Sequence, residues 1–247
     1  MIDVVVSRLE DAGELVTNDI LDRLGTQPRG VLGVATGSSP QPVYRSLAGR
    51  VRQGLNLSEL TFFALDEYLG LPTGHPQTYR VVLRRDLVEP LQLRADQVRL
   101  PEDPDSYERQ IAAAGGIDVQ LLGIGRNGHL GFNEPGSSLS GPTHITRLAD
   151  QTRQDNARFF SHPGEVPEHA VTVGLGTILS ARRLILLAFG SAKADAVHAA
   201  LNGPVTAAVP ASVLQLHDDV LVVLDTAAAE QYTREAPGIR SARESRR

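Results

Sequence analysis

Short apolar runs alternate along the chain with amphipathic stretches. Five runs rich in valine, isoleucine and leucine predict buried strands, at residues 31–35, 61–65, 119–124, 183–189 and 220–224. An amphipathic stretch over 43–52 predicts a helix between the first two strands. Strands that are apolar on both faces and separated by helical segments indicate a parallel sheet covered by helices. The predicted fold class is therefore α/β: one open, mostly parallel, Rossmann-like sheet with helices on both faces.

The chain shows no internal repeat and no low-complexity linker. Its 247 residues suffice for one large core, so we predict a single domain over residues 1–237. The segment 238–247 is polar and basic, and we expect it to be a disordered tail.

Composition narrows the class of protein. No apolar run approaches the ~20 residues of a transmembrane helix, and the first residues lack the basic start of a signal peptide, so we expect no membrane association. The absence of cysteine excludes disulfides and thiolate metal sites and fits a cytoplasmic location. A net charge of −5 argues against nucleic acid as the partner, but a few local cations can still hold a small anion.

Residues with hydroxyl, carboxylate, imidazole or ammonium side chains follow four of the predicted strands. Open parallel sheets bind ligands beyond the carboxyl ends of their strands, so these segments should meet at one edge. They are 36–39, 66–68, 125–134 and 190–193. Their concentration there predicts an active site.

The segment Thr36, Gly37, Ser38 and Ser39 lies between a strand and a helix. Glycine lets the backbone approach a ligand, hydroxyls donate hydrogen bonds, and a helix N-terminus favours an anion. These residues can cradle a phosphate, or they can be an ordinary turn with N-capping serines.

Asp66 directly follows a predicted buried strand. A carboxylate at the rim of a core is partly desolvated, and its pKa can be tuned for general-base catalysis. The alternative is an Asp that caps a helix.

The glycines of 123–128 match the Gly-x-Gly-x-x-Gly pattern of dinucleotide sites. That fingerprint requires a helix to open at the last glycine. The following residues, 129–138, contain two glycines and a proline and cannot form a regular helix. The dinucleotide interpretation fails.

His129 lies in this glycine-rich loop with Asn127 and Glu134 close by in sequence. An imidazole oriented by a carboxylate is a standard device for proton transfer. One histidine and one glutamate are too few ligands to predict a metal site.

Two cations are candidates for holding an anion. Lys193 is the single lysine among 24 lysines and arginines, which suggests a site that needs a compact ammonium, although chance would also explain it. Arg158 lies in a predicted short helix over 152–160, where it can clamp a phosphate or simply face solvent.

Taken together, these segments resemble the glucosamine-6-phosphate deaminase family. The matching pieces run in order along nearly the whole chain and include Phe132-Asn133-Glu134-Pro135, a continuation that the related 6-phosphogluconolactonases lack. They are 35–40, 65–71, 123–138, 152–160, 190–194 and 210–217.

The resemblance implies a cofactor-free conversion of glucosamine 6-phosphate to fructose 6-phosphate and ammonia. In it, Asp66 matches the base that moves a proton from C2 to C1, and His129 matches the group that opens the sugar ring. Asn127 and Glu134 match the residues that support His129. The phosphate-binding residues would be Thr36, Gly37, Ser38, Ser39, Arg158 and Lys193.

The sequence also departs from the family pattern. Many members carry Asp where this chain has Asn127, which can orient an imidazole but supplies no negative charge. Members activated by N-acetylglucosamine 6-phosphate carry basic residues after the Glu-Pro pair, whereas this chain has Thr143-His144-Ile145-Thr146. We therefore expect no such activation, and a monomer or small homo-oligomer.

Three alternatives keep the same fold. They are a deaminase for galactosamine 6-phosphate, a lactonase acting on a phosphorylated sugar acid, and a sugar-phosphate sensor without turnover.

Overall fold

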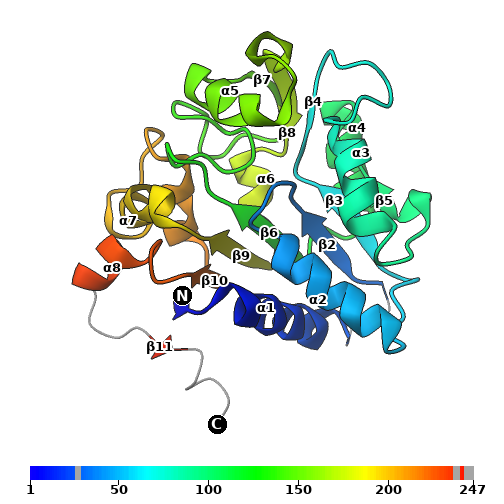
Figure 1. Cartoon of the computed structure of the whole chain (residues 1–247), viewed down its shortest axis with the longest axis horizontal. Helices are drawn as coiled ribbons and strands as arrows, with labels where there is room; N and C mark the ends of the chain where they lie inside the picture. The colour runs from blue at the N-terminus through cyan, green and yellow to red at the C-terminus, as the bar shows by residue number, and fades with distance from the viewer. Residues whose placement is uncertain (26–28, 236–239, 242–247) are drawn as a thin grey trace.

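The main sheet of the protein has eight parallel strands in the computed structural model, which describes residues 1–25, 29–235 and 240–241 (Figure 1). Their order across the sheet is β11-β1-β10-β9-β6-β2-β3-β5, and every neighbouring pair is parallel. The strands are β1 (Ile2–Val6), β2 (Val31–Val34), β3 (Thr61–Ala64), β5 (Val98–Arg99), β6 (Val119–Gly123), β9 (Arg183–Ala188), β10 (Val220–Leu224) and β11 (Arg240–Ser241). The predicted α/β class with a parallel sheet is confirmed.

The five strands predicted from apolar runs form the consecutive centre of this sheet, β10-β9-β6-β2-β3. Each is buried along nearly its whole length, because helices cover both faces. Strand β1 was not among the predicted strands. It pairs with β10 in the register Ile2 with Val220 to Val6 with Leu224, so β10 lies between β1 and β9.

Helices pack on both faces of the main sheet. The helices are α1 (Leu9–Leu24), α2 (Gln41–Arg52), α3 (Tyr79–Leu83), α4 (Pro104–Ala113), α5 (Asp150–Asn156), α6 (Leu175–Leu179), α7 (Ala194–Asn202) and α8 (Glu230–Glu235). Alternate residues of β10 face the two helical layers: Val222 packs in one apolar cluster with residues of α4, α6 and α7, and Val223 packs in another with residues of α1 and α2. None of the helices in the described part of the chain is long and apolar enough to cross a membrane.

A small antiparallel sheet accompanies the main one, in the order β4-β8-β7. Its strands are β4 (Asp66–Tyr68), β7 (His144–Arg147) and β8 (His169–Thr172). In Figure 1 it lies with α5 at the top of the molecule, where β4 continues the chain from β3. This sheet was not predicted, and it makes Asp66 a strand residue rather than a helix cap.

The predicted division into a domain (1–237) and a tail (238–247) remains a prediction. Residues 236–239 and 242–247 lie outside the described residues, and Arg240–Ser241 pair with Val5 and Val6 of β1.

Candidate active site

One cavity of about 720 Å³ collects the predicted site residues. Asp66, His129 and Lys193 all line it, although they come from segments that follow three different strands. It is also lined by Thr36, Gly37, Ser38, Ser39 and Arg158. Parallel strands bring these segments together because their carboxyl ends share one edge. Asn127 and Glu134 do not line the cavity but lie behind His129.

The loop from Thr36 to Ser39 joins β2 to α2 and forms one wall of the cavity. Gly37 has φ +90°, a backbone conformation that favours glycine. The first turn of α2 contains no acidic residue of its own. This arrangement suits an anion such as a phosphate ester.

Asp66 lies in β4 with only 6% of its surface exposed. Burial, with a smaller contribution from the neighbouring charge of Glu67, raises the pKa of Asp66 to about 8. A carboxyl group with a pKa near neutrality can accept a proton from carbon and return it in the same turnover.

Glu67, the next residue, has a structural role. Its carboxylate accepts hydrogen bonds from the backbone N–H groups of Tyr68, Tyr79 and Arg80, at 2.8, 2.8 and 2.9 Å. It therefore ties β4 to the first turn of α3 and satisfies N–H groups that lack partners within that helix. The two adjacent carboxylates thus have different functions.

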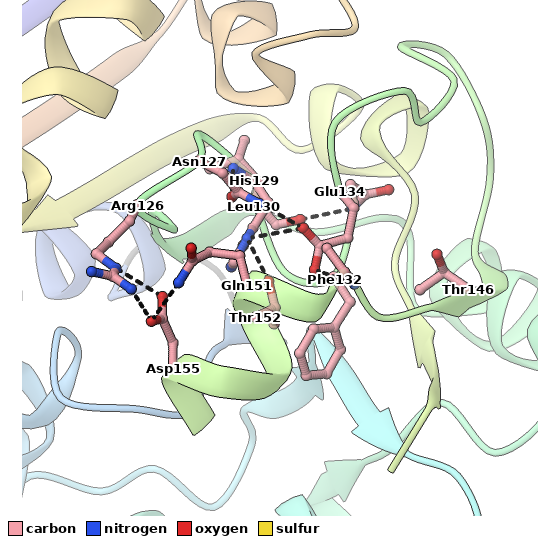
Figure 2. A network of polar contacts seen from close by, with 12 residues as sticks. Arg126, Asn127, His129, Leu130, Phe132, Glu134, Thr146, Gln151, Thr152 and Asp155 are labelled. Carbon is pink, nitrogen blue, oxygen red and sulfur yellow. Dashed lines mark hydrogen bonds and ion pairs between the residues drawn. The ribbon is translucent and has the colours of Figure 1, made fainter. Parts of the chain in front are cut away.

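His129 is held from behind by Glu134 (Figure 2). Nδ1 of His129 lies 3.4 Å from Oε2 of Glu134, and Asn127 donates a hydrogen bond of 2.9 Å to the same oxygen. Burial opposes ionisation of Glu134, but hydrogen bonds from His129, Thr152 and Asn127 and the charge of His129 outweigh it and lower the pKa of Glu134 to about 2. An ionised Glu134 beside Nδ1 favours the tautomer that carries its proton on Nδ1, and this tautomer leaves Nε2 of His129 to serve the cavity.

Hydrogen bonds fix Phe132 and Asn133, which follow His129 in the loop. Asn133 is fully buried, and its amide group donates to the backbone carbonyls of Leu130 and Val173, at 2.9 and 2.8 Å. The N–H of Phe132 donates to the hydroxyl of Thr172 on β8 at 3.0 Å. These contacts turn the chain so that Glu134 comes back to His129.

The glycines of the Gly-x-Gly-x-x-Gly pattern serve this loop. A Cβ atom on Gly125 would stand 2.2 Å from Cε1 of His129, so the imidazole ring lies directly on the Gly125 backbone. Gly128 has φ +83°. No helix begins at Gly128, in agreement with the rejection of a dinucleotide site.

Two predicted cations lie in the cavity wall. Nζ of Lys193 donates a hydrogen bond of 2.7 Å to the carbonyl of Ile124, at the end of β6. Burial lowers the pKa of Lys193; the charge of Asp155 opposes this, whereas those of Arg158 and Arg126 add to it. Arg158 is exposed, and its guanidinium carbon lies 4.7 Å from the centre of the Phe159 ring.

Several lining residues were not predicted. Tyr68 and Tyr79 pack with ring centres 4.8 Å apart, and Asn156 donates to the hydroxyl of Tyr68 at 2.8 Å. Burial raises the pKa of Tyr68 to about 12, so this hydroxyl stays protonated. Arg126 and Asp155 also line the cavity. Of these lining residues, only Tyr68 could have been found from the sequence, because it lies two residues after Asp66 in an extended segment and so points to the same side.

Residues that could bind a metal are not gathered anywhere in the described part of the chain: it contains no group of three or more His, Asp or Glu side chains suited to that task. The cavity offers acid–base groups and cations.

Comparison with known proteins identifies the family. Residues 7–223 match the model of the glucosamine-6-phosphate isomerases/6-phosphogluconolactonase family. The protein belongs to this family. Its membership confirms the resemblance inferred from the sequence motifs.

Within the family, the similar proteins include several deaminases. A glucosamine-6-phosphate deaminase of Streptomyces avermitilis is 50% identical over 238 residues, covering 92% of this chain and 91% of the relative. A glucosamine-6-phosphate deaminase of Pseudarthrobacter chlorophenolicus is 49% identical over 234 residues, covering 92% and 90%. A solved structure of a monomeric glucosamine-6-phosphate deaminase matches with a TM-score of 0.89 at 37% identity, covering 93% of this chain and 99% of that one.

Proposed function

We propose that this protein converts glucosamine 6-phosphate and water to fructose 6-phosphate and ammonia. The observation that carries the proposal is the shared cavity of Asp66, His129 and Lys193, which offers a base, a proton shuttle and a phosphate cation to one hexose. Relatives of about half identity over nearly the whole chain are glucosamine-6-phosphate deaminases, which supports the same activity.

The substrate would be held by its phosphate. The loop Thr36 to Ser39 supplies backbone and hydroxyl donors at the start of α2, and Arg158 and Lys193 supply positive charge. Binding through the phosphate leaves the sugar carbons to extend across the cavity towards Asp66 and His129.

His129 would open the ring. With its Nδ1 proton directed to Glu134, Nε2 can take the proton from the C1 hydroxyl and deliver it to the ring oxygen, which breaks the C1–O5 bond. Asn127 supports the same geometry. Its side-chain amide donates a hydrogen bond to Glu134, and its Oδ1 accepts one from the backbone N–H of His129 at 3.2 Å.

Asp66 would carry out the isomerisation. The ionised carboxylate takes the proton from C2 of the open-chain aldehyde and gives an enolamine, and the same proton returns to C1. The resulting C2 iminium adds water and expels ammonia, which leaves the ketone of fructose 6-phosphate. The raised pKa of Asp66 suits both halves of this transfer, because the group binds and releases a proton near neutral pH.

The loop continuation favours a deaminase over a lactonase. Phe132 and Asn133 are anchored by Thr172, Leu130 and Val173, and this anchoring brings Glu134 to His129. A lactonase needs no ring-opening shuttle of this kind, since its substrate already carries an activated carbonyl group.

We also propose that the protein acts in the cytoplasm as a monomer. The similar monomeric deaminase supports this assembly. Light scattering coupled to gel filtration at micromolar concentration should give a mass near 26.5 kDa, and a mass of two or more chains would contradict the proposal of a monomer.

Ammonia release tests the proposed function directly. The purified protein should release ammonia from glucosamine 6-phosphate, with galactosamine 6-phosphate and 6-phosphogluconolactone as parallel substrates. Asp66→Asn should lower the rate at least about a thousandfold and abolish exchange of the C2 hydrogen with D₂O, while fructose 6-phosphate still binds. Asp96→Asn, which removes an exposed carboxylate outside the cavity, is the matched control. Preference for either alternative substrate would overturn the assignment.

A further inference from the structure

A carboxylate lies among the cations of the cavity. Arg126, from the loop after β6, and Asp155, on α5, both line it and point towards each other (Figure 2). Nε of Arg126 donates a hydrogen bond of 2.9 Å to Asp155, and Nη2 donates to the other carboxylate oxygen. Gln151 donates a further bond of 3.1 Å to Asp155.

This ion pair connects the two segments that supply the other cations. Lys193 bonds to the carbonyl of Ile124, two residues before Arg126, and Arg158 lies one helical turn after Asp155. Arg126, Asp155, Arg158 and Lys193 all line the same cavity, so the four charged groups share one neighbourhood.

The charge of this cluster matches a phosphate monoester. Arg126, Arg158 and Lys193 carry three positive charges and Asp155 one negative charge, which leaves +2. A sugar phosphate carries close to two negative charges at neutral pH, since its second pKa is about 6. Without Arg126, the remaining three groups would carry only +1.

Arg126 keeps donors for a second partner. Its side-on contact with Asp155 uses Nε and Nη2, so the two hydrogens of Nη1 stay available for phosphate oxygens. The pair is also accessible to water, with 48% of the Arg126 side chain and 28% of the Asp155 side chain exposed. Ion pairs of this kind are held loosely, so the guanidinium can turn to a ligand.

We propose that Arg126 is a further binding residue for the phosphate group of the substrate. This inference rests on the proposed function for the identity of the sugar. The competing explanation is that the pair only fastens α5 to the loop after β6.

Two neutral substitutions separate these explanations. Arg126→Gln removes the cation and the ion pair, whereas Asp155→Asn removes the ion pair but keeps the cation. Calorimetric titration with fructose 6-phosphate should show binding weakened about tenfold by Arg126→Gln. Asp155→Asn should bind as tightly as the wild type or more tightly, because a negative charge beside the phosphate is gone.

The matched control is Arg182→Gln. Arg182 is likewise about half exposed and pairs with an aspartate, Asp118, but at the opposite edge of the sheet, before β6 and β9. This variant changes the net charge equally and should leave binding within about twofold of wild type. Inorganic phosphate should follow the same order of affinities, and fructose without phosphate should not respond to Arg126→Gln.

Any weakening by Asp155→Asn would overturn the proposal, because a fastening role predicts loss in both variants. Unchanged binding in Arg126→Gln would overturn it as well. These binding measurements need no turnover. A protein that releases no ammonia but shows this order of affinities would therefore refute the proposed function and retain the phosphate role of Arg126.

Discussion

The imidazole ring of His129 lies flat against the backbone of Gly125, where a Cβ atom would stand 2.2 Å from Cε1 of the ring. The lack of a side chain on Gly125 leaves the space that the imidazole ring occupies, and the contact with Glu134 sets the orientation of the ring. The position and the orientation of the proposed proton shuttle have separate causes.

Gly125→Ala should therefore damage catalysis without touching any acid–base group. The methyl group pushes the imidazole from its position, and we expect kcat to fall about a hundredfold. Gly123→Ala, at the end of β6, is the control, because its Cβ atom would meet only Ser39, at 3.6 Å, an ordinary contact. Steady-state kinetics of both variants check this, and equal activities would show that the ring can lie elsewhere.

Asp66 should make the protein less stable as the pH rises. Its folded pKa of about 8 lies above the ordinary value of an aspartate, about 4, so the folded state holds this proton more tightly than the unfolded chain does. Stability is then lost between about pH 4 and pH 8, by a few kcal/mol at most, and stays low above pH 8.

Asp66→Asn removes this dependence. The free energy of unfolding of the variant minus that of the wild type should grow from pH 4 to pH 8, as measured by urea titration at each pH. Glu134 has the opposite effect, since its lowered pKa of about 2 stabilises the folded state above its ordinary pKa and this is lost on acidification. The contribution of Glu134 is the same in the wild type and in the Asp66→Asn variant, so it cancels in the difference between their free energies of unfolding. A difference independent of pH would mean that Asp66 titrates normally.

Lys193→Arg should raise KM for glucosamine 6-phosphate about tenfold, with a smaller effect on kcat. The ammonium of Lys193 lies 2.7 Å from the carbonyl of Ile124 in a partly buried position, where a planar guanidinium does not fit without displacement. Steady-state kinetics give both constants, and the thermal midpoint serves as the control for folding. Wild-type kinetics in this variant would mean that the single lysine of the chain is an accident.

N-acetylglucosamine 6-phosphate should not activate the protein. Members of the family that respond to it carry basic residues where this chain has Thr143 to Thr146, a segment that overlaps β7. Initial rates against glucosamine 6-phosphate should follow a hyperbola, unchanged by the N-acetyl compound. A sigmoidal curve that becomes hyperbolic on its addition would contradict the prediction.

Much of the fold follows from the sequence because its signals are local. The central strands are continuous apolar runs, and a parallel sheet places whatever follows them at one edge, so Asp66, His129 and Lys193 could be assigned to one cavity. Strand β1 was missed although four of its five residues are apolar, because its pairing depends on β10, more than two hundred residues away.

The unpredicted part of the site depends on contacts between distant segments. Tyr68 enters the cavity because β4 pairs with β8, from Asp66 with Thr172 to Tyr68 with Ala170. Nothing in the sequence distinguishes Arg126 and Asp155 from ordinary surface residues. Only the packing of α5 against the loop after β6 brings the two side chains together. No periodicity or composition carries that information.

The insertion of β10 between β1 and β9 has a consequence for biosynthesis. On the ribosome, the first strand emerges early, but its hydrogen-bonding partner follows only when residues 220–224 have been made. Until then, β1 and β9 both expose unpaired peptide groups, and such edges invite association with other chains. A nascent or prematurely terminated polypeptide that ends before β10 therefore exposes both of these edges, and we expect completion of the sheet to be one of the last events of folding.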